Sequence, residues 1–131
     1  MIALDTNVLL RFFAQDDPAQ SRKAEEILAA LSDAEPGWIG LVVLMELVWA
    51  LTRLYRVDKE GTIHVLDQLL IRQEFVLERT ETVAVAVELF RAGKADFDDC
   101  LFAASAKAAG CSRTLTFDRI GARDAGMELI G

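Results

Sequence analysis

Four acidic residues stand at positions where a purely structural role is hard to assign. Asp5 and Asp118 each follow a short apolar run that is typical of a buried strand. Glu46 lies inside a largely apolar stretch, and Asp99 is close to the start of an Ala-rich one. Ligand sites in α/β proteins lie at the carboxyl ends of strands. These four carboxylates are therefore the first candidates for chemistry.

A parallel α/β arrangement brings strand ends and helix starts to one edge of the sheet, so the four carboxylates are expected to converge. At an effective dielectric constant of about 20, two carboxylates roughly 5 Å apart repel by about 3 kcal/mol. Such a cluster requires protonation or a divalent cation. Oxygen donors without His or Cys favour Mg²⁺ or Mn²⁺ over zinc. A site of this kind suits hydrolysis of a phosphodiester bond.

Each acid also has an ordinary structural interpretation. Asp5 and Asp118 could shape a turn or cap a loop, and Glu46 could pair with Arg53 or Arg56. Acids at the start of a helix could simply cap it and favour its positive end. Three neighbouring residues compete for that position: Asp96, Asp98 and Asp99. Hydrogen-bond partners in the structure separate these interpretations.

The elements that must position these acids follow from the apolar pattern, which alternates strands with helices and predicts an α/β domain with a mainly parallel sheet. Strands are expected at five short runs: 2–4, 38–40, 75–77, 113–117 and 127–130. Helices are expected at six periodic stretches: 7–13, 19–31, 42–55, 59–72, 83–90 and 96–109.

Helix caps are expected at the boundaries of several of these stretches. The pair Asp16-Asp17 before Pro18 and the single acid Asp58 should start helices, and Thr80 or Thr82 should start the helix that ends near residue 90. Helix ends have a signal of their own, since a glycine in the left-handed conformation commonly terminates a helix. That role is expected for one glycine, Gly110.

Composition and charge narrow the class of protein. The 131 residues are expected to form one domain, and the formal net charge of −7 argues against broad, non-specific coating of DNA. The longest nearly apolar stretch, 38–51, is too short to span a bilayer, and no basic leader precedes it. We therefore expect a cytoplasmic protein. Cys100 and Cys111 suggest neither a disulfide framework nor a zinc site.

The apolar share of 53% is high for a soluble domain, which indicates that another protein covers part of the surface. Val42, Met45 and Trp49 form a second apolar side on the stretch that carries Glu46, although core packing is an alternative. The only histidine, His64, is expected at the surface. Several arginines could contact phosphates: Arg11, Arg53, Arg56, Arg113 and Arg119.

Taken in order, four segments resemble the PIN domain. They read DTNVLL at 5–10, LMELVW at 44–49, ADFDDCLFAA at 95–104 and LTFD at 115–118. The size and order more narrowly resemble the VapC toxins of bacterial VapBC toxin–antitoxin pairs, and the resemblance covers essentially the whole chain. It implies a single PIN domain over 1–131, built as a three-layer α/β sandwich with a mainly parallel central sheet flanked by helices.

The resemblance also implies an activity, Mg²⁺-dependent endonucleolytic cleavage of RNA, with Mn²⁺ as a possible substitute. Asp5 and Asp99 would bind the metal directly, and Glu46 and Asp118 would complete the acidic set. Three residues would support that shell or, for the last, replace Asp99 as ligand: Asn7, Thr116 and Asp96. The resemblance further implies a homodimer and a cognate VapB-like antitoxin whose C-terminal segment covers the site.

Other functions remain to be compared with this one. A catalytically silent PIN-like module would bind a partner without cutting RNA. A phospho-accepting receiver domain needs an acidic pair after its first strand, where this chain has Asp5 alone. A haloacid-dehalogenase phosphatase begins with Asp-x-Asp, whereas position 7 here is Asn.

Overall fold

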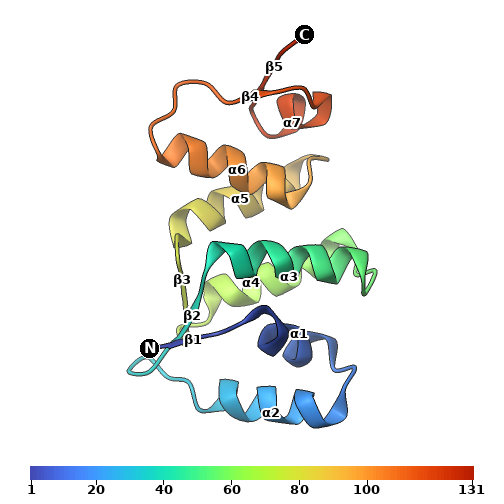
Figure 1. Ribbon diagram of the computed structural model, residues 1–131. Coiled ribbons are helices and arrows are strands. Elements are labelled where there is room, and N and C mark those ends of the chain that lie inside the picture. Colours follow the sequence, from blue (N-terminus) through green and yellow to red (C-terminus); the bar gives the residue numbers. More distant parts are fainter. The chain divides into compact units, whose positions relative to one another are not determined.

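A computed structural model describes residues 1–131, which form two compact units, Met1–Glu78 and Arg79–Gly131. The first unit contains a parallel sheet in the order β1-β2-β3, whose strands lie side by side in Figure 1. The strands are β1 (Ile2–Ala3), β2 (Gly37–Ile39) and β3 (Phe75–Leu77). The helices are α1 (Thr6–Ala14), α2 (Pro18–Ala29), α3 (Leu41–Arg53) and α4 (Lys59–Ile71).

Backbone pairing in this sheet continues one residue beyond the strands. Leu4 N donates to Trp38 O at 2.9 Å, and Glu78 N donates to Ile39 O at 3.0 Å. Because all three strands run in the same direction, the residues that follow them leave the sheet at the same edge. Asp5 follows β1 there, as the sequence predicted.

The core of the first unit is formed by leucines that α1, α3 and α4 direct inward. Leu9, Leu44, Leu47, Leu66 and Leu69 are all fully buried. The predicted caps of two helices are confirmed, because the side chain of Asp17 accepts from Gln20 N at 3.0 Å and that of Asp58 from Gly61 N at 2.8 Å.

The second unit begins with two helices that pack along each other, α5 (Thr80–Ala92) and α6 (Phe97–Ala108). Phe90 and Phe97 meet edge to face across them, with ring centroids 5.7 Å apart. The rest of the unit contains β4 (Leu115–Thr116), α7 (Arg119–Asp124) and β5 (Glu128–Leu129), with β4 and β5 paired in parallel. Gly110 ends α6 with φ +90°, as predicted.

Several sequence predictions need correction. The strand predicted at 113–117 is only Leu115–Thr116, because its partner β5 offers two residues for pairing. Helix α5 begins at Thr80 after Arg79, so neither Thr80 nor Thr82 is its cap residue. The six-residue helix α7 was not predicted at all, since it is too short to show an apolar period.

Three apolar side chains of the first unit are exposed and do not join its core. Ile2 is 46% exposed because β1 is an end strand of its sheet, and Ile27 and Leu54 are 43% and 64% exposed. The fold class itself is confirmed as α/β, with every strand pair parallel, although the paired strands form two sheets. None of the helices has both the length and the hydrophobicity that a membrane crossing requires.

Candidate acidic site

Asp5 stands at the cap position of α1 and does not act as a cap. Its backbone is extended, with φ −81° and ψ 160°, and its side chain makes no hydrogen bond to the first turn of the helix. The residue is exposed. The side chain of Asp5 therefore does not cap α1, although its carbonyl oxygen accepts from Val8 N at 3.1 Å.

Glu46 lies in the second turn of α3 and points away from the buried stripe of that helix. Its Oε2 accepts a hydrogen bond from Thr6 Oγ1 at 3.2 Å. Thr6 is buried and directly follows Asp5. The alternative in which Glu46 pairs with Arg53 or Arg56 is wrong, because no such ion pair forms. Glu46 is thus hydrogen-bonded to the residue that directly follows Asp5.

Glu78 was missed by the sequence analysis, although it takes part in building this edge. It follows β3 as Asp5 follows β1, and its Oε1 accepts from Leu41 N, the first amide of α3, at 3.0 Å. A carboxylate at this end of a helix satisfies a free N–H group and favours the positive end of the helix dipole. Glu78 therefore anchors the start of the helix that carries Glu46. An acid that follows an apolar run was the signal that could have found it.

Three acids gather at the start of α6 in the second unit. Asp96, Asp98 and Asp99 each offer a carboxylate oxygen, and these oxygens lie within 4.8 Å of one another. Asp98 Oδ1 accepts from Asp99 N at 2.9 Å, whereas Asp96 makes no side-chain bond to the helix it precedes. Helix capping therefore accounts for Asp98 and leaves Asp96 and Asp99 without that role.

Asp118 joins this group from the far end of β4. Burial, then the charges of Asp98, Asp118 and Asp96, raise the pKa of Asp99 above its ordinary value, and a hydrogen bond to Asp118 raises it further. Asp118 also caps α7, because its Oδ1 accepts from Ile120 N at 3.0 Å. The cap interpretation of Asp118 is thus correct and does not prevent its contact with Asp99.

The donor set of the second unit fits a hard divalent cation. Every donor is a carboxylate oxygen, the type that Mg²⁺ and Mn²⁺ prefer. Burial raises the pKa of Asp99 first and the charges of neighbouring acids raise it further, so a bound cation would relieve the crowding of negative charge there. Of the four predicted acids, Asp99 and Asp118 are hydrogen-bonded in the second unit, and Glu46 is hydrogen-bonded to Thr6, the residue after Asp5, in the first.

The structure also places the residues that were predicted to support the acids. Thr116 Oγ1 accepts from Asp118 N at 3.0 Å, so its hydroxyl bonds to the backbone of Asp118. Asn7 is exposed in the first turn of α1. His64 is exposed, as expected.

Two of the arginines proposed for phosphates are engaged within the protein. Arg11 donates to Gln20 Oε1 at 2.6 Å and to Tyr55 Oη at 3.0 Å. Arg113 forms a two-point ion pair with Glu128, with distances of 2.9 and 2.6 Å. Arg119 is exposed. Arg119 directly follows Asp118 in the sequence.

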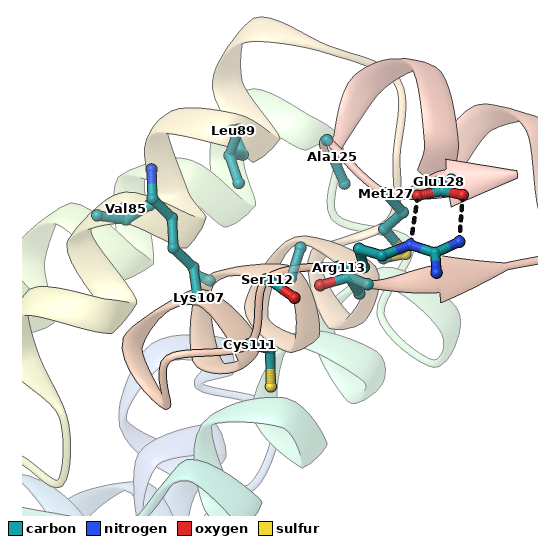
Figure 2. Close-up of a pocket in the computed structure, with 13 residues that line it drawn as sticks. Val85, Leu89, Lys107, Cys111, Ser112, Arg113, Ala125, Met127 and Glu128 are labelled. Carbon is teal, nitrogen blue, oxygen red and sulfur yellow. Dashed lines mark hydrogen bonds and ion pairs between the residues drawn. The ribbon is translucent and has the colours of Figure 1, made fainter.

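A pocket of about 460 Å³ lies elsewhere in the second unit. Figure 2 shows the Arg113–Glu128 pair at one end of it and Lys107 at the other. Val85 and Leu89 contribute an apolar wall from α5. None of the four predicted acids lines this pocket, so it is separate from the acidic residues.

Comparison with known proteins supports one family. The PIN domain family matches residues 2–125, which include all four acids. The chain is also 28% identical over 120 residues to a VapC ribonuclease of Aquifex aeolicus (strain VF5), and the match covers 91% of this chain and 88% of that protein.

Proposed function

The chain belongs to the PIN domain family, and on that basis we propose that it is a Mg²⁺-dependent endoribonuclease of the VapC type, the toxin of a toxin–antitoxin pair. The observation that carries the proposal is the group of Asp96, Asp98 and Asp99, whose carboxylate oxygens lie within 4.8 Å of one another, with Asp118 hydrogen-bonded to Asp99. The similarity to a VapC ribonuclease supports RNA as the substrate.

We assign two of the four acids to direct contact with the metal and two to its surroundings. Asp5 and Asp99 would hold the metal directly, and Glu46 and Asp118 would complete the acidic set. When bound, Mg²⁺ lowers the pKa of an attacking water and offsets the charge that develops on the phosphate. The donor chemistry of the second unit supports this choice of ion, since all its donors are carboxylate oxygens.

The chain's own hydrogen bonds prepare these acids for their roles. In the first unit, Thr6 restrains the Glu46 carboxylate through its hydroxyl. In the second, Thr116 fixes the backbone of Asp118. Groups that orient the ligands of a metal contribute strongly to its affinity. We assign Asn7 a similar supporting role and keep Asp96 as the alternative ligand to Asp99.

We also propose a VapB-like antitoxin as partner, a homodimer as the assembly and the cytoplasm as the location. The exposed row on α3 supports a protein-binding surface, because Val42, Met45 and Trp49 are 71%, 40% and 56% exposed at helical spacing. Apolar side chains grouped in this way favour contact with another protein. The interpretation of this row as core is thus not supported.

The proposal is tested by incubating the purified, antitoxin-free chain with total cellular RNA in Mg²⁺, Mn²⁺ or EDTA. We expect discrete RNA fragments with either metal and none in EDTA. The variant Asp118→Asn should remove cleavage, and His64→Ala, which changes an exposed residue outside the site, should cleave as the parent does.

A folded parent that leaves RNA intact in both metals would contradict the proposal. That outcome would favour the silent PIN-like module, which binds a partner and cuts nothing. Cleavage that persists in EDTA would instead contradict the metal requirement while leaving RNA as the substrate.

A further inference from the structure

The segment between β4 and α7 presents an aromatic ring on a fixed turn. Thr116 Oγ1 accepts from Asp118 N at 3.0 Å, and Asp118 Oδ1 accepts from Ile120 N at 3.0 Å. Ile130 N also donates to Thr116 O at 2.8 Å. These bonds hold the backbone on both sides of Phe117, so the place from which its side chain extends is set by the fold.

The ring of Phe117 is 80% exposed, the largest exposed fraction of any phenylalanine in this chain. Phe75, Phe90 and Phe97 are at most 8% exposed, as expected for a side chain that gains from burial. A single exposed apolar residue requires no explanation by itself. The position of Phe117 suggests a reason for its exposure, because Asp118 follows it directly.

A second exposed phenyl ring lies on the helix that carries Asp99. Phe102 is 54% exposed and follows Asp99 by three residues on α6, so both side chains share a face of the helix. Asp99 and Asp118 contact each other. Each acid therefore has an exposed phenyl ring beside it.

Resting on the proposed function, we propose that Phe117 stacks on a base of single-stranded RNA next to the bond that is cut, with Phe102 as a second stacking ring. Exposed aromatic rings bind single strands in this way, and the contact tolerates different bases because every base has a flat face. Exposed Arg119, on the other side of Asp118, would meet the phosphate of the same strand. Ring, acid and guanidinium are thus consecutive residues.

The test measures binding of a short oligoadenylate to the full chain in EDTA, where no cleavage is expected. Phe117→Ala should weaken binding between about 5- and 150-fold, the loss typical of one stacked base. Ile71→Ala removes an equally exposed side chain, 73% exposed at the end of α4, and should bind as the parent does. Since Phe117 is exposed, both variants should unfold at the temperature of the parent.

A second variant reports the contact itself. Phe117→Trp should bind as tightly as the parent, and its added indole fluorescence should be quenched by oligoadenylate. A strand of equal length without bases should not quench it, because that strand offers only sugar and phosphate. Phe102→Ala should also bind oligoadenylate more weakly than the parent.

Three results would overturn the stacking role: no binding by the parent, parent-like binding by Phe117→Ala, or an equal loss with the strand that lacks bases. Cleavage of total RNA by the parent reports separately on the proposed function. A chain that cuts RNA while Phe117→Ala binds normally would therefore refute stacking alone.

Discussion

Thr6 Oγ1 donates a hydrogen bond to Glu46 Oε2 at 3.2 Å, across 40 residues of sequence. The donor is buried, and its carboxylate partner is exposed. A buried donor with one partner fixes the geometry of that partner, because leaving the hydroxyl unpaired would be costly. The bond therefore restrains an acid on α3 from the first turn of α1, beside Asp5.

Thr6→Val, which keeps the shape and removes the hydroxyl, should lower kcat for RNA cleavage by about ten- to a hundredfold, with a smaller change in KM. Thr6→Ser keeps the hydroxyl and should restore most of the rate. Steady-state kinetics on one RNA substrate measure both. Equal losses in the two variants would indicate that packing, and not the hydrogen bond, matters at this position.

Asp99→Asn should raise the melting temperature measured in EDTA. The pKa of Asp99 is raised in the folded protein, first by burial and then by the charges of Asp98, Asp118 and Asp96. A raised carboxyl pKa means that the ionised form is disfavoured on folding, so the cost is present at neutral pH and is lost as pH falls through the folded pKa. The neutral amide removes that cost, and calorimetry at pH 7 measures the gain. A lower melting temperature would contradict this electrostatic description.

Asp124 should contribute stability that acid removes. The hydrogen bond from Arg123, followed by that from Lys94 N, lowers the pKa of Asp124 from 3.8 to about 2. A lowered pKa gives stability that is complete above about pH 4 and is lost as pH falls towards 2. Asp124→Asn should flatten the pH dependence of urea unfolding in this window. Asp33→Asn, at an exposed acid in the first unit, should keep the dependence of the parent.

Gly93→Ala should destabilise the protein by about 1–3 kcal/mol, the usual cost of crowding a packed site. A Cβ at Gly93 would lie 2.7 Å from Asp124 Cβ, whereas one at Gly121 would meet nothing closer than 3.5 Å. Gly121→Ala, inside α7, is therefore the matched control and should leave stability unchanged or raise it. Denaturant unfolding compares the two. Equal stability in both variants would show that the Gly93 site yields at no cost.

The sequence predicted the elements well wherever apolar periodicity and caps agreed. The strand at 75–77 and the helices that begin after Asp17 and Asp58 are examples. Short elements were predicted poorly. Helix α7 spans fewer than two turns, and the length of β4 depends on a two-residue partner elsewhere in the chain. The residues around β4 do not reveal how long its partner strand is.

The acids were identifiable because they interrupt apolar patterns, whereas the groups that support them were not. Thr6 shows no signal beyond its place after Asp5, since its partner is 40 residues away. Glu78 had the same signal as Asp5 and was missed. The exposure of Phe117 contradicts its apolar character, so only the structure reveals it.

The central proposal is that Asp5 and Asp99 bind the metal ion that RNA cleavage requires, and Mn²⁺ titration of the full chain by calorimetry tests it most directly. Asp5→Asn and Asp99→Asn should each abolish Mn²⁺ binding and RNA cleavage together, and the double variant should be no worse than either. Asp67→Asn, at an acid of α4 outside the site, is the control and should bind Mn²⁺ as the parent does. Unchanged Mn²⁺ affinity in either single variant, with the fold intact, would contradict the account.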